Sequence, residues 1–317
     1  MSELRTLRDL TEWLLLSEIP TIRYLTLRDL IDPPPSPGRI RAAYDAIMDT
    51  GPAAALFNRQ TIEGKWSKDQ NYYTPKYRST HWSMVLLTEL HAHPGDPRLA
   101  RGADYMLNVT AERMHNDHSP ENQDWACLWG NMLRYVILAG LFDDARVRPL
   151  VRLVALASQS REWACRQNDN LPCAWGAVRA LWGLAAIPPE DREPFVEEAI
   201  ESGLSFMLDR AEALVTGDYP TPTEPHRHWS TFNFPLFYQA DILFTLRVAM
   251  ELNALDRPGA KAGVQWLLDQ RGVNGRWRTL SPYRQVTWHV MGTIEESKRW
   301  AALHALRVLK AAGRPIE

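Results

Sequence analysis

Apolar residues recur along this chain three or four positions apart, the spacing of a helix face, and no convincing stretch alternates with a period of two. Three helices are predicted near the start, over 3–17, 21–31 and 39–57, with a break at Pro20. The segment 32–38, DPPPSPG, predicts a stiff extended connector because consecutive prolines hold an extended backbone. The predicted fold class is therefore all-α.

A similar helix start recurs five times, which indicates an array of repeated helical units. An apolar helix follows each start, and then a short turn rich in Asp, Pro and Arg leads to a second helix with a charged face. Helices that are apolar all round belong in an inner layer, and helices with one charged face belong in an outer layer. The first positions of the five units are Ser79, Cys127, Cys173, Asp241 and Ser297.

Two loops share a spacing of glutamine, glycine and tryptophan. They are 60–66 (QTIEGKW) and 270–277 (QRGVNGRW), with a weaker echo at 159–166 (QSREWACR). The glutamine is expected to cap the end of an outer helix, the glycine to let the chain reverse, and the tryptophan to pack between units. These residues resemble the QW motif of the squalene–hopene cyclase and terpenoid synthase group, and the layout resembles protein prenyltransferase β subunits.

The resemblance covers most of the chain from about residue 55 onward and implies an (α/α) toroid, in which inner helices surround a central cavity. Residues 1–58 are expected to pack on the ring or to start it. Residues 59–317 are expected to form the helical pairs, so that the whole chain is one continuous domain. An open helical solenoid is the alternative arrangement.

Four segments are most similar to short bacterial single-domain proteins described as cyclase or prenyltransferase repeat proteins. This similarity implies no particular reaction. The segments are CLWGN (127–131), the Cys165 to Cys173 pair, FNFPLFYQADIL (232–243) and SKRWAALHALRVLK (297–310).

Composition and charge narrow the functional classes. Hydrophobic residues make up 45% of the chain, and its 13 tryptophans and 10 tyrosines could line an apolar pocket as well as a core. A formal charge of -2 gives no general attraction for nucleic acid, and no apolar run is long enough for a transmembrane helix. The amphipathic N-terminus does not resemble a signal peptide, and three cysteines, an odd number, indicate thiols in a reducing cytoplasm.

The acid motifs of the resembling enzymes do not occur in this sequence. Triterpene cyclases protonate an alkene with a D-x-D-D motif, and diphosphate-ionising synthases use D-D-x-x-D. Asp143 and Asp144 fall in a predicted surface turn, where turn and cap roles are expected. Squalene-type cyclisation is therefore not expected.

Asp241 follows an aromatic run and precedes an almost continuous apolar helix. If the helix already begins within 234–240, the carboxylate lies in its first turns and points into the ring. Apolar walls would there raise its pKa for acid–base chemistry, or the carboxylate would bind a metal. If the helix begins at Asp241, the residue is an N-cap.

The three cysteines suggest a metal site. Cys127 and Cys173 hold equivalent places in consecutive units, and Cys165 precedes Cys173 in the loop that leads into the same helix. Three thiols at one rim would suit zinc or another thiophilic metal, with Asp241 or a histidine as the fourth ligand. The resemblance implies a site of similar kind, since protein prenyltransferases hold a catalytic zinc with Asp, Cys and His. Inert core cysteines are the alternative. The candidate histidines are His81, His115, His118, His226 and His228.

A group of tyrosines and basic residues occupies the loop before the first unit. In a toroid this loop would overlie the rim, where it could bind an anionic head group or form a lid. Packing of the rings on Trp82 is the alternative. The group consists of Tyr72, Tyr73, Lys76, Tyr77 and Arg78.

The sequence predicts a cytoplasmic, cyclase-like or prenyltransferase-like enzyme that acts on an apolar or isoprenoid-like small molecule. The alternatives are a non-catalytic protein that holds a lipid, peptide or protein partner, and a prenyltransferase-like subunit that needs an α-type partner. The candidate catalytic residues are Asp241, Tyr77 and His81. The candidate cavity residues are Trp82, Trp129, Trp175 and Tyr238.

Overall fold

The computed structural model describes residues 6–67, 71–115, 125–159, 162–222 and 226–315, and most of them are helical. Among these residues the only strands are β1 (Ala164–Cys165) and β2 (Leu171–Pro172), which pair antiparallel. The predicted all-α class is therefore confirmed.

The N-terminal region differs in detail from the predicted helices. The first helix is shorter, and the second ends in a π-helical turn. The predicted helix over 39–57 is divided, because Thr50 is extended and Gly51 takes a φ of +75°. The elements are α1 (Leu7–Leu15), α2 (Pro20–Leu25), η1 (Thr26–Leu30), α3 (Pro37–Asp49) and α4 (Gly51–Phe57).

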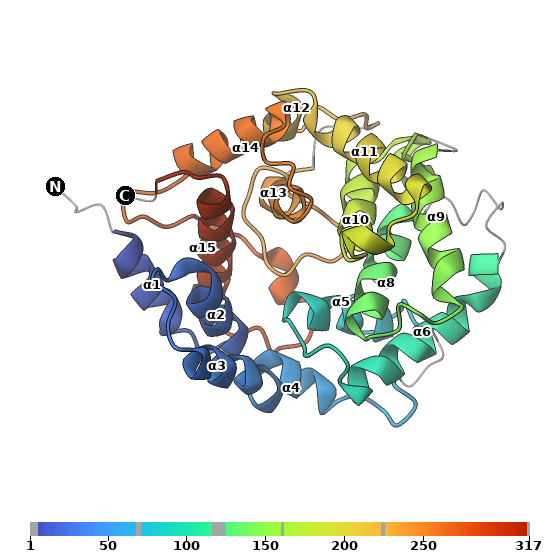
Figure 1. The fold of residues 1–317 in the computed structure, drawn as a ribbon, viewed down its shortest axis with the longest axis horizontal. Helices are drawn as coiled ribbons and strands as arrows, with labels where there is room; N and C mark the ends of the chain where they lie inside the picture. The colour runs from blue at the N-terminus through green and yellow to red at the C-terminus, as the bar shows by residue number, and fades with distance from the viewer. Residues whose placement is uncertain (1–5, 68–70, 116–124, 160–161, 223–225, 316–317) are drawn as a thin grey trace.

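The helices that follow form two layers (Figure 1). The inner helices are α5 (Thr80–Glu89), α8 (Ala126–Leu138), α10 (Ala174–Leu184), α13 (Ile242–Glu251) and α15 (Ile294–Ala311). Those before α15 are strongly apolar, and every residue of the first of them is buried. Outside the inner helices lie α6 (Pro97–His115), α9 (Val147–Gln159), α11 (Pro194–Leu208), α12 (Ala213–Thr216) and α14 (Pro258–Asp269). Short 3-10 turns are η2 (Arg166–Asn168), η3 (Pro189–Asp191) and η4 (Pro282–Arg284).

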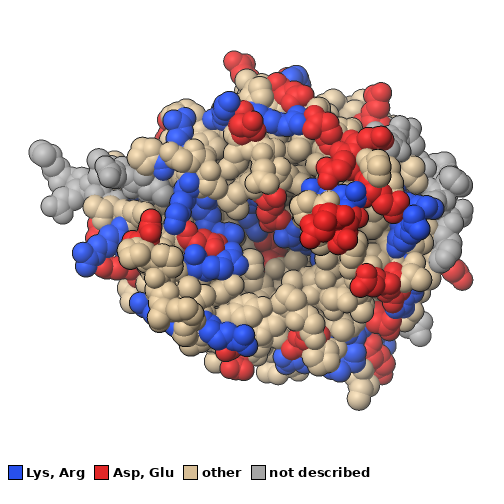
Figure 2. Space-filling model, viewed as in Figure 1, with Lys and Arg blue, Asp and Glu red and all other residues tan. Residues whose placement is uncertain are grey.

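Each inner helix packs on the next one in the chain. α5 contacts α8, α8 contacts α10, α10 contacts α13, and α13 contacts α15. The last of these, α15, packs on α2 and η1, so the two ends of the chain meet (Figure 1). On the face shown in Figure 2 both signs of charge are interspersed, and acidic residues gather over α11.

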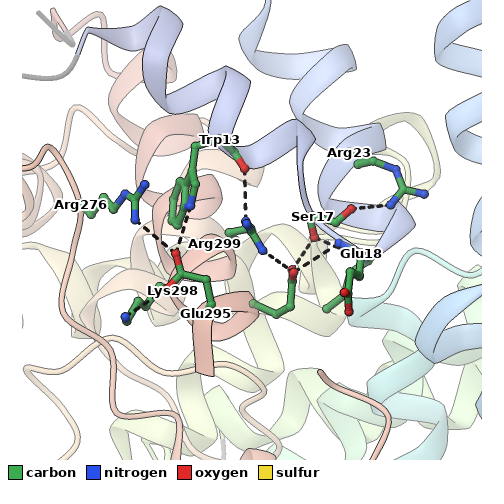
Figure 3. A network of polar contacts seen from close by, with 10 residues as sticks. Trp13, Ser17, Glu18, Arg23, Arg276, Glu295, Lys298 and Arg299 are labelled. Carbon is green, nitrogen blue, oxygen red and sulfur yellow. Dashed lines mark hydrogen bonds and ion pairs between the residues drawn. The ribbon is translucent and has the colours of Figure 1, made fainter. Parts of the chain in front are cut away.

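A polar seam joins the N-terminal and C-terminal regions (Figure 3). Glu295, at the start of α15, accepts hydrogen bonds from Trp13 Nε1 at 3.1 Å and from Arg276 at 3.2 Å. Arg299 donates to the Trp13 carbonyl at 3.2 Å, and Ser17 donates to the neighbouring carboxylate of Glu296. These contacts connect α1 and the segment after it to α15.

The glycines of the two QW-like loops take the chain-reversing conformation that the sequence predicts. Gly64 and Gly275 take φ values of +87° and +74°, a region that glycine enters without steric cost. Trp66 Nε1 donates to the Leu56 carbonyl, and Trp277 Nε1 donates to the carbonyl of Leu267, both at 2.8 Å. Both tryptophans are buried. The glutamine of the second loop is the C-cap residue of α14, and that of the first binds carbonyls of its own loop and of α6.

A buried group of charged and amide side chains connects the inner helices, and we call it the central cluster. Arg247 donates to Glu89 at 2.6 Å, and Arg179 lies 4.0 Å from the same carboxylate. Arg179 also donates to the Gln239 carbonyl at 3.0 and 2.7 Å. Burial lowers the pKa of Arg179 to about 9 although Glu89 opposes the shift, so the guanidinium stays charged at neutral pH. Asn131, the fourth member, donates to the backbone carbonyl of Phe237 at 2.9 Å.

Candidate functional site

A cavity of about 600 Å³ lies at the end of the molecule where α8 and α10 begin, beside the loops that lead into α5 and α13. Six aromatic rings of Tyr and Trp and three thiols belong to half of its lining residues, and we call it the rim pocket. The rings belong to Tyr73, Trp125, Trp175, Tyr219, Trp229 and Tyr238. The thiols belong to Cys127, Cys165 and Cys173.

Backbone groups outside the pocket satisfy the polar ends of two of these rings. Tyr219 donates its hydroxyl to the Met207 carbonyl, and Trp229 donates Nε1 to the Leu214 carbonyl, both at 2.7 Å. Buried Tyr and Trp side chains usually need such a partner. Since the hydrogen bonds are made on the helical side, these rings present apolar surface to the pocket.

Lys76 is exposed and lies at the edge of the pocket beside Tyr238. Its Nζ donates to the Tyr238 hydroxyl at 2.9 Å and lies 4.3 Å from the centre of the same ring. The Tyr238 ring in turn contacts Trp175 edge to face, with ring centres 5.8 Å apart. No Asp or Glu is among the described residues that line this pocket.

His226 also contacts Trp175 edge to face, with ring centres 4.6 Å apart. Burial lowers its pKa, and the neighbouring His228 and Arg227 lower it further, so the imidazole is neutral at pH 7. Its Nδ1 accepts a hydrogen bond from the backbone N–H of His228 at 3.3 Å. His226 therefore offers the pocket a neutral imidazole.

The cysteines reach the pocket from two helix starts and a hairpin. Cys173 is the N-cap residue of α10, and its Sγ accepts a hydrogen bond from Gly176 N at 3.3 Å. Cys127 lies in the first turn of α8, and Cys165 lies in β1. A hydrogen bond with Cys165 and then burial raise the pKa of Cys173 well above its usual value. Burial raises the pKa of Cys127 to about 12.

The prediction of a metal-binding group is wrong for the part of the chain that the structure describes. No group of three or more His, Cys, Asp and Glu side chains there could hold a metal ion. Asp241, the expected fourth ligand, does not line the rim pocket.

Among the candidate histidines whose side chains the structure describes, only His226 lines the rim pocket. His81 is buried with its Nδ1 3.3 Å from the Tyr135 hydroxyl, and burial lowers its pKa to about 3. The His115 side chain and the whole of His118 lie outside the described residues. His226 and His228 lie in the loop that follows α12, with ring centres 5.3 Å apart.

Asp241 is the N-cap of α13, and the expected earlier start of this helix is wrong. Its carboxylate accepts hydrogen bonds from Phe244 N at 2.7 Å and from Asn233 N at 3.2 Å. The preceding segment stays non-helical although it is buried, because side chains of α8 and α10 bind its carbonyl groups. Burial raises the pKa of Asp241 to about 7, against the lowering effect of these hydrogen bonds. An acid–base role for Asp241 stays a prediction.

The other predicted residues fall into two groups. Trp175 and Tyr238 line the rim pocket, whereas Trp82 and Trp129 are fully buried in the core. Tyr77 is half-buried beside Trp82, and its hydroxyl accepts a hydrogen bond from Gln239 at 3.2 Å. Catalytic roles for Tyr77 and His81 stay predictions.

Sequence reasoning did not identify Trp125, Tyr219 and Trp229 as pocket residues. Each is an aromatic residue in a turn or loop, as Tyr73 and Tyr238 are. Buried core tryptophans such as Trp66 also lie in loops, and Trp175 lines the pocket from the first turn of α10. No local sequence signal therefore separated the pocket rings from the core rings.

Comparisons of the chain with protein-family models, with curated proteins and with solved structures found no match. The resemblance to cyclases and prenyltransferases therefore stays a prediction based on motifs. Among the described residues no helix is long and apolar enough to span a membrane.

Proposed function

We propose that the chain is an (α/α) toroid whose rim pocket binds an amphiphilic small molecule. The ligand has an isoprenoid-like or aromatic body and an acidic head group. The toroid is supported by the order of the inner helices, each packed on the next, and by the contact of α15 with α2 and η1. The central cluster lies among the inner helices, so the proposed ligand site is at their end instead of their centre.

The aromatic wall is the observation that carries this proposal. A cavity of about 600 Å³ falls within the range of roughly 300–1,000 Å³ that is common for small-molecule sites. Its rings offer flat apolar surface, and two of them have their polar ends turned to backbone carbonyls. An apolar body would gain free energy here by leaving water.

Lys76 supports an acidic head group. It is the only Lys, Arg, Asp or Glu among the described lining residues, so its ammonium has no carboxylate in the pocket wall. The helix starts at Cys127 and Cys173 add the positive ends of two helix dipoles on the same side. A carboxylate or phosphate would therefore be favoured over a cation.

Calorimetric titration with farnesoic acid and with farnesol tests the apolar body and the acidic head group of the proposed ligand. The two probes share the apolar chain and differ mainly in the acid group. The wild type should bind the acid about fivefold more tightly than the alcohol, as expected for one partly exposed ion pair. Lys76→Gln should remove this preference. The control is Lys310→Gln, which changes a lysine in the last turn of α15. This variant should keep the preference for the acid.

Trp175→Ala tests the aromatic wall with the same probes. Removal of the ring should weaken both ligands about tenfold, the effect typical of a buried aromatic contact. The control is Trp266→Ala, which removes a ring on α14 that packs on Phe232 away from the pocket. Equal affinities in the wild type and in Trp175→Ala, or no binding of either probe, would contradict the proposal.

A catalytic function is the second candidate, and His226 favours it. Because Nδ1 accepts the backbone hydrogen bond, the neutral imidazole beside Trp175 carries its proton on Nε2 and can donate a hydrogen bond to a ligand bound against that ring. Chemical change of a bound isoprenoid probe, followed by mass spectrometry, should then be lost in His226→Gln while binding is kept. Unchanged probe in the wild type would favour a binding protein.

A further inference from the structure

The hairpin that carries Cys165 brings its thiol to that of Cys173. β1 and β2 pair Ala164 with Pro172 and Cys165 with Leu171, and Cys173 N donates to the Trp163 carbonyl at 2.8 Å. Side chains two positions apart on a strand lie on the same face. Cys165 and Cys173 are therefore diagonal neighbours on one face of the hairpin, and both line the rim pocket.

The hairpin holds this arrangement against backbone strain. Four residues around it take positive φ values, a region that residues with a side chain rarely enter: Glu162 at 47°, Trp163 at 66°, Asp169 at 52° and Asn170 at 61°. Such strain persists only where surrounding contacts fix the backbone. Here the Asn168 side chain donates to the Leu171, Pro172 and Pro220 carbonyls, at 3.3, 3.0 and 2.9 Å.

We propose that Cys165 and Cys173 form a reversible disulfide, which makes the wall of the rim pocket sensitive to thiol–disulfide chemistry. Both cysteines line a cavity wide enough for a small disulfide, and the hairpin places them on one face. The side-chain hydrogen bond between the two thiols agrees with this geometry. The proposal does not depend on which ligand the pocket binds.

The oxidant is a small-molecule disulfide such as oxidised glutathione. The Cys165 thiol loses its proton to water and attacks one sulfur, which breaks the oxidant's S–S bond and releases one glutathione thiol. The Cys173 thiolate then attacks Sγ of Cys165, so the protein disulfide forms and the second glutathione leaves. Two protein thiols are oxidised and one oxidant disulfide is reduced to two thiols.

Cys173 is suited to the second step. The thiolate that forms there keeps the hydrogen bond from Gly176 N and lies at a helix start, and both favour the anion. Modification of Cys165 also removes the thiol contact that is the largest cause of the raised pKa of Cys173. Thiol–disulfide exchange needs a thiolate, so the reaction should be faster at pH 8.5 than at pH 7.

The test measures the disulfide by mass spectrometry of the full-length protein equilibrated with glutathione redox buffers at pH 8.5. Digestion without reductant should give a peptide that joins Cys165 to Cys173. The folded chain should have an effective thiol concentration at least tenfold higher than the same chain unfolded in urea. An equal or lower value in the folded chain would overturn the proposal.

Serine variants separate the pair from the third thiol. Cys165→Ser and Cys173→Ser should abolish the disulfide, and serine is itself a good N-cap, so α10 should remain intact in the second variant. Cys127→Ser should still form it. A peptide that joins Cys127 to either of the other cysteines, or loss of the disulfide in Cys127→Ser, would assign the chemistry elsewhere and overturn the proposal.

Titration of the reduced and the oxidised protein with farnesoic acid then measures how the disulfide changes the affinity of the rim pocket. Oxidation should change the affinity at least threefold, since the new bond alters the pocket wall. Unchanged affinity would overturn the proposed coupling to the pocket. If the probe binds neither form, the ligand proposal fails, while the mass measurement still decides the disulfide.

Discussion

The central cluster and the rim pocket both contain polar side chains among apolar neighbours, but they differ in what those side chains face. In the central cluster Glu89 lies between Arg179 and Arg247, and the two arginines have protein partners. In the rim pocket Lys76 and the thiols face open space. Partnered charges indicate a structural role, whereas polar groups that face a cavity are available to a ligand. Changes in the cluster should therefore alter stability, and changes in the pocket should alter binding.

Glu89→Ala should cause the largest loss of stability. It leaves Arg179 and Arg247 buried without their carboxylate, and breaking a buried ion pair in this way costs about 3–5 kcal/mol. Urea unfolding followed by circular dichroism measures the free energy of unfolding. The matched control is Glu251→Ala, which breaks a partly exposed pair with Arg134 and should cost less than about 1 kcal/mol. Equal losses would show that the central cluster is no more important than a surface pair.

Gly130→Ala should be the next most damaging change. Gly130 lies where α8 approaches α10, and a Cβ there would come within 2.3 Å of the Arg179 carbonyl oxygen. The helices must move apart, at a cost of about 3 kcal/mol. Gly176→Ala is the control at the pocket end of α10, where the nearest atom, Cβ of Ala126, is 3.5 Å away. It should be neutral, or stabilising by up to about 1 kcal/mol. Similar thermal midpoints for the two variants would contradict this close approach.

Asp241 lies between the two regions and should show a smaller effect that depends on pH. Asp241→Ala loses the cap of α13, which is worth about 1–2 kcal/mol. Asp241→Asn keeps a cap and removes the charge. The carboxyl pKa is raised from 3.8 to about 7 in the folded protein, so its stabilising contribution is complete below pH 3.8 and is lost as the pH rises through 7.

Unfolding at pH 5 and pH 8 measures this effect. The free energy of unfolding of the wild type relative to Asp241→Asn should fall between the two values. A difference that stays constant with pH would mean that Asp241 does not titrate in this range.

The sequence predicted the local geometry of the loops between helices better than it predicted the chemistry of the candidate site. The turn glycines and buried tryptophans of the QW-like loops were predictable because local spacing fixes their geometry. The start of α13 was not, since the segment before it is held by side chains of α8 and α10 that are distant in sequence. Similarly, Ser297 lies inside α15, whose N-cap is Thr293. Repeat alignment aligns related helices but does not fix where each one begins.

The sequence predicted that the three cysteines lie close together, from the repeat positions of Cys127 and Cys173 and from the loop position of Cys165. It did not predict that the thiols of Cys127 and Cys173 have raised pKa values. Burial and the contact between Cys165 and Cys173 raise the pKa values of the thiols, and both depend on packing. Core and pocket tryptophans were not distinguished, because Trp82 and Trp175 both follow a helix start closely. Whether each tryptophan is a core residue or a pocket residue depends on which segments cover it in the folded chain.

Lys76→Gln should have the smallest effect on stability and gives the most direct test of the comparison. Lys76 is exposed, and its contacts with Tyr238 are a hydrogen bond and a ring interaction at the edge of the cavity. The free energy of unfolding should change by less than about 0.5 kcal/mol, as for most surface substitutions. The preference for farnesoic acid over farnesol should nevertheless disappear. Loss of stability comparable to that in Glu89→Ala would mean that Lys76 also has a structural role, and the distinction between the two regions would not hold.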